Sequence, residues 1–285
     1  MRLFSKSLNQ NKLTRYFKNK RNGIVNRYFL KQTSTQQYEV VEKLKNLDFI
    51  VFCIAFNKPD CIKIMIDCWK RYAINSALVV VDNSSCKNAK REIAELFHLN
   101  GIFYLSLPKN PEWHPNRSHA LAMNWVFYNL VIEIKPDYFG YLDHDCFPYK
   151  KFDLSAHLSG HEIYGDRRVS YKHPEVWNLW AGFCFYKYDH VKDRDVNFTH
   201  SIELGLDTGG KNWNSVYKNL LKQNCNFSSV KHIKDLDIKC GQRFNAVLDS
   251  FVHIGSVSHP VKSKKINRGN LDELFNELAV KNTVI

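Results

Sequence analysis

Short apolar runs of strand length recur along the first half of the chain. Residues 49–56 are continuously apolar, a pattern typical of a strand that is covered on both faces. Similar runs occupy residues 77–81, 102–107 and 138–142. We therefore expect four buried strands, and their continuous apolar character favours a parallel sheet.

Segments with helical periodicity separate these runs. Residues 60–69 carry apolar side chains at helical spacing behind Pro59, and residues 89–97 and 117–134 are predicted as two further helices. Strand, helix and strand in this order form a βαβ unit with parallel strands. The predicted fold class is therefore α/β, with an open, mostly parallel sheet flanked by helices.

The regular alternation gives way to shorter, mixed segments after residue 150. Residues 177–186 are aromatic and strand-like, and residues 204–210 form a loop that leads into a helix predicted over residues 213–221. A short late strand is expected at residues 249–255. An apolar stripe over residues 271–278 predicts a surface helix that closes the domain.

Basic residues are concentrated at the amino end of the chain. The formal net charge is +13, and residues 1–45 carry eleven Lys or Arg against two Glu, a local net charge of +9. Such a segment can contact anionic lipid, nucleic acid or an acidic partner, or it can remain a solvated tail. We divide the chain into a basic appendage at 1–46, a main domain at 47–260 with halves at 47–150 and 151–260, and a C-terminal amphipathic helix at 261–285.

Composition bounds the class of protein. Hydrophobic residues make up 44% of the chain and aromatic residues 14%, which excludes disorder of the whole chain. No apolar run approaches the roughly 20 residues that a membrane-spanning helix needs, and the amino terminus lacks a signal-peptide core. Eight cysteines without a Cys-x-x-Cys pair argue against a zinc ribbon or a disulfide framework. We expect a cytoplasmic protein with reduced thiols, and peripheral contact of the basic segment with an anionic membrane is left open.

Two carboxylates follow the predicted strand at residues 138–142. Asp143 and Asp145 are one residue apart, and residues i and i+2 of an extended backbone point to the same side. Both side chains can therefore face one ion while His144 points away. Two adjacent oxygen donors suit a hard divalent cation such as Mn²⁺ or Mg²⁺. Because Asp is also common in turns, a turn after the strand is the alternative.

Polar residues also follow two earlier strands. Asn57 comes directly after the run at residues 49–56, and Asp82 directly after the run at residues 77–81. In open α/β sheets, ligands bind outside the carboxyl ends of the strands. We therefore expect Asn57, Asp82 and Asp143 to lie on one rim of the sheet, although an Asp after an apolar strand is more often a turn residue, which is the alternative for Asp82.

The order of these features is more specific than any one of them. A strand ending at Asn57, a strand followed by Asp82, a helix start at residues 116–124 and a strand followed by Asp143-His144-Asp145 succeed one another. This order resembles the nucleotide-sugar-dependent glycosyltransferases of the GT-A fold, most closely the large inverting family 2 type. The resemblance implies a Rossmann-like nucleotide-binding half and a mixed acceptor half.

The resemblance also implies which residues bind the sugar donor, a UDP- or GDP-sugar. The loop from Ala55 to Asn57 is expected to lie against the nucleobase, and Asp82 is expected to contact the base or the ribose. Arg117 and His119 lie at the start of a helix, whose N-terminus favours negative charge. They are therefore expected near the diphosphate.

The metal site implied by the resemblance contains three side chains. Asp143 and Asp145 are expected to hold Mn²⁺ or Mg²⁺. His253, on the late strand, is similar to the histidine with which some family members complete the metal shell. A histidine within the core is the alternative for His253.

The acceptor side of the site is implied less directly. In resembling enzymes the catalytic base lies downstream of the metal motif, at the start of a helix. Asp207 matches this position, and Glu203 is the second candidate. The sequence departs from the common family pattern here, because that base is often the second member of an acidic pair, and a helix cap also explains Asp207. Trp180 and Gly182 are expected to line the donor sugar, with a core role as the alternative for Trp180.

The leading functional hypothesis is a metal-dependent glycosyltransferase that moves a sugar to a hydroxyl of a glycan, lipid or protein, with inversion by single displacement. A nucleotidyltransferase of the same fold is the first alternative, although no glycine-rich basic loop follows the first strand. A basic module that binds nucleic acid or anionic membrane, joined to an inactive α/β domain, is the second. No sequence signature supports nucleic-acid binding.

Overall fold

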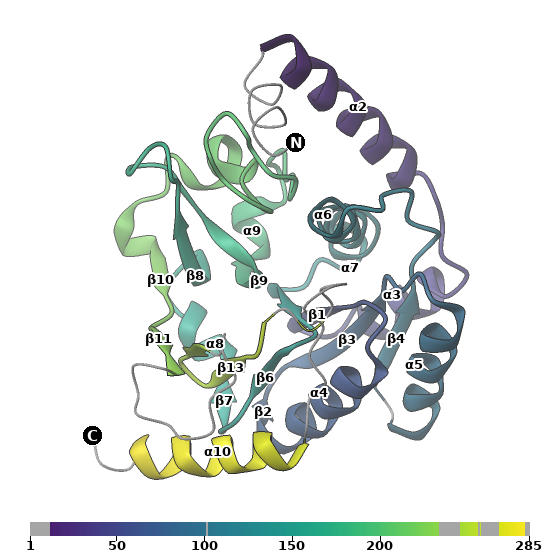
Figure 1. Ribbon diagram of the computed structural model, residues 1–285, viewed down its shortest axis with the longest axis vertical. Coiled ribbons are helices and arrows are strands. Elements are labelled where there is room, and N and C mark those ends of the chain that lie inside the picture. Colours follow the sequence, from purple (N-terminus) through teal and green to yellow (C-terminus); the bar gives the residue numbers. More distant parts are fainter. Residues whose placement is uncertain (1–11, 101, 234–245, 256, 258–267, 283–285) are drawn as a thin grey trace, which may run out of the picture.

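A central sheet organises the molecule (Figure 1). This computed structural model describes residues 12–100, 102–233, 246–255, 257 and 268–282. The strands of the sheet are β1 Phe49–Ala55, β3 Ala77–Asp82, β4 Phe103–Ser106, β5 Tyr138–Asp143, β8 Ile163–Val169, β9 Trp177–Lys187 and β10 Cys225–Phe227. Their order is β10-β8-β9-β5-β1-β3-β4. β1 pairs in parallel with β3 and β5, whereas β9 is antiparallel to β5 and β8.

Helices cover both faces of this sheet. The side chains of β1 therefore alternate between two hydrophobic cores, one on each face. Val51 faces the core that contains α4 and α10, whereas Phe52 faces the core that contains α3 and α6. All seven residues of β1 are buried, which explains its continuous apolar run. The flanking helices are α3 Gln37–Leu44, α4 Pro59–Tyr72, α5 Lys87–Asn100, α6 Pro115–Val126 and α10 Arg268–Asn282.

A second sheet joins the late part of the chain to the end of β5. It consists of β6 Cys146–Pro148, β11 Val230–His232, β12 Ala246–Leu248 and β13 Phe251–His253, in the order β11-β12-β13-β6. β13 is antiparallel to β6, and His253 is opposite Cys146 in their register. This register places residue 253 beside the turn that follows β5.

The predicted α/β class is confirmed. The four runs expected as buried strands are β1, β3, β4 and β5, and their mutual pairings are parallel. The aromatic segment is β9, and the late strand contains β13. Other short elements are β2 Ala73–Ile74, β7 Phe152–Asp153, α8 Leu154–Leu158, α9 Tyr188–Val191 and η3 Lys222–Asn224.

The helix predicted over residues 213–221 is wrong in extent. The structure has only a π-helical turn, η2 (Trp213–Tyr217). Trp213 and Tyr217 both pack against Trp177, whereas Leu221, at the predicted end of the helix, is exposed. The helix predicted over residues 117–134 is present as α6, a π-helical segment η1 (Phe127–Val131) and α7 (Ile132–Ile134).

The basic segment at the amino end is packed onto the domain in its described part. α2 (Lys12–Leu30) lies beside α6 on the outside of the molecule (Figure 1). Phe29 is fully buried, and Trp125 Nε1 donates a hydrogen bond to the Gln32 carbonyl at 2.8 Å. The described part of this segment is therefore packed and not a free arm, while the division of the chain at residue 46 stays a prediction. Residues 1–11 of that appendage, and the boundary placed at residues 260 and 261, lie outside the described residues.

Two further expectations concern the environment of the protein. Among the described helices, none combines the length and the apolarity that crossing a bilayer requires. The described cysteines form no disulfide, and Cys240 lies outside the described residues.

Candidate functional site

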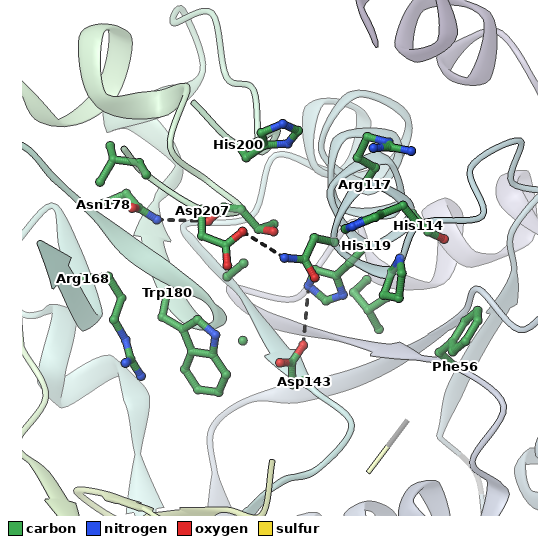
Figure 2. Close-up of a pocket in the computed structure, with 18 of the residues that line it drawn as sticks. Phe56, His114, Arg117, His119, Asp143, Arg168, Asn178, Trp180, His200 and Asp207 are labelled. Atoms are coloured by element: carbon green, nitrogen blue, oxygen red, sulfur yellow. Dashed lines mark hydrogen bonds and ion pairs between the residues drawn. The ribbon is translucent and has the colours of Figure 1, made fainter. Parts of the chain in front are cut away.

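A cavity of about 1010 Å³ lies at the carboxyl ends of β1 and β5 (Figure 2). Its walls come from segments that are far apart in the sequence: the start of α6, the turn after β5, β8, β9, β13 and the loop before η2. Residues predicted for the site that line it are Arg117, His119, Asp143, Asp145, Trp180, Gly182, Asp207 and His253. Sequence reasoning therefore identified much of one connected surface.

Three of these side chains converge at the end of β5. Asp143, Asp145 and His253 each offer a ligand atom, and the three atoms all lie within 4.8 Å of one another. The β13–β6 register brings His253 to the pair, and the Ile254 N–H donates to the Asp145 carbonyl at 3.0 Å. His144 points elsewhere, with its Nδ1 at 3.2 Å from the Ile54 carbonyl oxygen. Both carboxylates thus face one point, as the i, i+2 spacing predicts.

The buried Asp145 forms an ion pair with the partly buried His253. Burial alone would raise the pKa of Asp145, but the charge and hydrogen bond of His253 outweigh burial and lower this pKa to about 2. Burial alone would lower the pKa of His253, but the Asp145 and Asp143 carboxylates raise it. His253 Nε2 lies 3.5 Å from Asp145 Oδ1. The pair leaves the second carboxylate, Asp143, facing the cavity with 26% of its side chain exposed.

Gly182 and Trp180 hold Asp143 and His253 in place from β9. A Cβ atom at Gly182 would lie 2.4 Å from Asp143 Oδ2 and 2.3 Å from the Trp180 ring, so a side chain at this position would displace one or both. Trp180 packs against His253 with ring centroids 4.4 Å apart and the ring planes tilted by 53°. Gly182 was expected to let the backbone approach the donor sugar closely. In the structure its backbone lies close to the Asp143 carboxylate.

The two basic residues at the start of α6 have different surroundings. His119 Nε2 lies 3.5 Å from Asp143 Oδ1, inside the cavity. Arg117 instead donates from Nε to Glu112 Oε2 at 2.9 Å, and Figure 2 shows it extending away from Asp143. Glu112 also accepts from Arg21 of α2. The structure therefore places His119 nearer than Arg117 to the carboxylate pair.

Arg168 is a cavity residue that sequence reasoning missed. It lines the cavity from β8, its guanidinium lies 5.5 Å from the Trp180 ring centroid, and Figure 2 shows the two side by side. It pairs with Asp166 at 2.5 Å, a carboxylate whose pKa is raised by burial although Arg168 opposes that rise. A register shift in the β8–β9 pairing falls between Gly165 and Arg167, so simple alternation could not have assigned Arg168 to a face.

Asp207 lies in the same cavity, away from the three converging ligand atoms. Its Oδ1 accepts a hydrogen bond from Asn116 Nδ2 at 3.0 Å, and in the view of Figure 2 its carboxylate lies above Trp180 and apart from Asp143. His200 lies close enough for the Asp207 charge to raise its pKa, although burial is the larger effect and the pKa of His200 is lowered overall. Glu203, the reserve for the base, is exposed and does not line the cavity. Neither Asn116 nor His200 was among the predicted site residues.

The remaining predicted donor-binding residues lie outside this cavity. Ala55 is fully buried, and Asn57 accepts hydrogen bonds from the Ser85 and Cys86 N–H groups. Asp82 is fully buried and accepts from the Ser84 N–H and from the Tyr104 hydroxyl, at 2.9 and 3.0 Å. The structure gives Asn57 and Asp82 local hydrogen-bond partners, and contact of all three residues with a nucleotide stays a prediction.

Comparison with known proteins gives limited information. No family model and no curated protein matches this chain. Among solved structures the chain is similar to S. aureus TarS, at 17% identity and a TM-score of 0.37 over 53% of this chain and 30% of that chain. The structure of S. aureus TarS 1-349 in complex with UDP aligns at 15% identity and a TM-score of 0.37, over 53% of this chain and 50% of that chain. The complex of TarS 1-349 with UDP-GlcNAc aligns at 15% identity and a TM-score of 0.36, over 53% of this chain and 48% of that chain. The match thus spans half or less of each TarS chain, and at such TM-scores it carries no functional argument.

Proposed function

We propose that this protein is a metal-dependent glycosyltransferase that uses a nucleoside diphosphate sugar. The observation that carries the proposal is the convergence of Asp143, Asp145 and His253 at the carboxyl edge of a parallel sheet, inside a cavity that also contains a separate carboxylate, Asp207. A cavity of about 1010 Å³ is large enough for a nucleotide sugar. The α/β architecture is the class expected of a GT-A protein.

The three converging side chains fit a divalent cation. Two carboxylate oxygens and one imidazole nitrogen suit Mn²⁺ or Mg²⁺. Neighbouring ligands of an octahedral ion with bonds of about 2.1 Å are about 3 Å apart, and His253 Nε2 and Asp145 Oδ1 are separated by 3.5 Å. A cation bound here would neutralise negative charge on the diphosphate leaving group.

The other cavity residues have roles in the transfer. Arg168 and His119 would face the diphosphate beside the cation site, where fixed positive charge stabilises the leaving group. Asp207 would accept the proton of the acceptor hydroxyl as its oxygen bonds to the anomeric carbon. The bond from that carbon to the diphosphate breaks, and its electron pair leaves with the nucleoside diphosphate. Attack opposite to the leaving group inverts the anomeric centre.

Release of UDP or GDP from a panel of nucleotide sugars, with candidate hydroxyl acceptors, tests the proposal. Release is expected with Mn²⁺ or Mg²⁺ and is expected to stop in excess EDTA; full activity in EDTA contradicts the metal assignment. Asp207→Asn is expected to lower kcat by about 10²–10⁴-fold, because general-base catalysis contributes that much, with little change in donor KM. The matched control Glu203→Gln should stay near wild type, since Glu203 lies outside the cavity. If Glu203→Gln lowered kcat and Asp207→Asn did not, Glu203 would be the base.

A further inference from the structure

α2 has apolar side chains on two opposite sides, one packed on the domain and one exposed. Its inner side packs through Phe29, which is fully buried, and through Val25, while Asn26 accepts a hydrogen bond from Asn124 at 2.9 Å. This inner side explains why the helix is held on the domain.

The outer side of α2 carries an exposed apolar stripe. Leu13, Phe17, Ile24 and Tyr28 have exposed fractions of 62%, 60%, 55% and 58%. At 100° per residue these four positions fall within about 60° of arc. Tyr16, 56% exposed, lies at the edge of the stripe. Large apolar side chains gathered on one exposed surface indicate an interaction site.

Positive charge surrounds this stripe. α2 contains six Lys or Arg and no acidic residue. Lys20 and Arg27 lie about 20° and about 40° beyond the Leu13 edge of this arc, between Leu13 and Tyr16, and both are exposed. Long basic side chains can hold their charge at the level of lipid headgroups while aromatic and aliphatic neighbours enter the acyl boundary.

We propose that the outer face of α2 docks onto an anionic membrane surface, with the helix lying in the plane of the interface. A bilayer with anionic headgroups matches both properties of the face, since it accepts apolar side chains and attracts basic ones. Nucleic acid would satisfy the charge but would leave the aliphatic Leu13 and Ile24 without an apolar contact. A second copy of the chain would bring two positive faces together.

Docking in this way would set the distance of the cavity from the membrane. Arg21 of α2 and Arg117 of the cavity wall contact the same Glu112 carboxylate, whose side chain is 1% exposed. A helix with its side chains is about 10 Å across, so this rim of the cavity would lie about one helix diameter from the headgroups. If the proposed function holds, acceptors at the membrane surface are then within reach.

Flotation of the full chain with lipid vesicles tests the proposal. Vesicles of phosphatidylcholine containing about one third phosphatidylserine are expected to carry the protein, and pure phosphatidylcholine vesicles to carry much less. The double variant Phe17→Ser/Ile24→Ser is expected to bind the anionic vesicles at least about tenfold more weakly, because two membrane-facing apolar side chains are lost. Lys20→Glu/Arg27→Glu is expected to weaken binding similarly and to reduce its salt dependence.

The matched control is Tyr38→Ser/Leu221→Ser, which removes two exposed apolar side chains outside α2. It should bind vesicles like wild type, and all variants should melt at the wild-type temperature because the changed side chains are exposed. Equal loss in the control, or no vesicle binding by the wild type, overturns the proposal. The proposal is also overturned if the protein binds duplex DNA or RNA more tightly than vesicles and Phe17→Ser/Ile24→Ser leaves that affinity unchanged. It is likewise overturned if the wild-type protein is a dimer in solution and the same variant is a monomer. The assay needs no turnover, so its result is independent of the proposed enzymatic activity.

Discussion

Asp82 and Asp143 follow the same sequence pattern but have opposite environments. Each ends an apolar strand that pairs in parallel with β1, so the two carboxylates lie on the same edge of one sheet. Asp82 is fully buried and hydrogen-bonded to Tyr104 and Ser84, whereas Asp143 faces the cavity. A carboxylate at a strand end is therefore not enough to define a site; its neighbours decide what it can bind.

The neighbours of the two carboxylates come from different parts of the fold. Tyr104 reaches Asp82 from the adjacent strand β4. No side chain covers Asp143 at residue 182, because that residue is glycine, and the carboxylate lies against its backbone. The pairing of β13 with β6 then supplies His253 to complete three converging ligands. Mutations near Asp82 and near Asp143 should therefore have different effects, on stability in the first case and on metal binding and turnover in the second.

The largest effect is expected from Asp145→Asn. The substitution keeps the size of the side chain but removes a charge that faces both His253 and the cation site. Transfer should fall by about 10³-fold or more, since catalytic electrostatic stabilisation of the leaving group depends on the bound cation. Initial rates at saturating Mn²⁺, with circular dichroism to check the fold, measure this. Wild-type turnover by a folded Asp145→Asn protein would disprove the metal assignment.

Gly182→Ala is expected to give an intermediate effect. The new Cβ would lie 2.4 Å from Asp143 Oδ2, so the carboxylate must move from its position. Displacing a ligand in this way should weaken Mn²⁺ affinity by about 10–100-fold, as loss of a positioning contact does. Isothermal titration with Mn²⁺ measures the change. The control is Gly23→Ala in α2, where a Cβ meets nothing within 4 Å; equal Mn²⁺ affinity in the two variants would show that Gly182 does not position Asp143.

Asp82→Asn is expected to have the smallest effect on turnover. Tyr104 would lose a charged acceptor in a buried setting, which lowers the free energy of unfolding by about 1–3 kcal/mol. Urea denaturation measures this loss, and Tyr104→Phe is the matched variant, because the two changes should be non-additive if they remove one interaction. A raised donor KM with unchanged stability would instead support the nucleotide contact implied by the family resemblance.

Local sequence pattern determined the elements and part of the site. The apolar runs predicted β1, β3, β4 and β5, since the periods of strands and helices follow from backbone geometry alone. The spacing of Asp143 and Asp145 was enough to predict that both carboxylates face one point, because that relation spans three residues. The family resemblance added His253 and Asp207, which the structure brings into the same cavity.

Only the tertiary structure decided which polar residues are buried with local partners and which face the cavity. The partners of Asp82, the approach of His253 and the position of Arg168 depend on strand register and on a register shift, which no single segment encodes. α2 shows no clear periodicity for the same reason: apolar residues on both sides mask one another in the sequence until Phe29 is seen buried and Phe17 exposed. Contacts between distant segments set these outcomes, because local periodicity carries no information about what lies opposite.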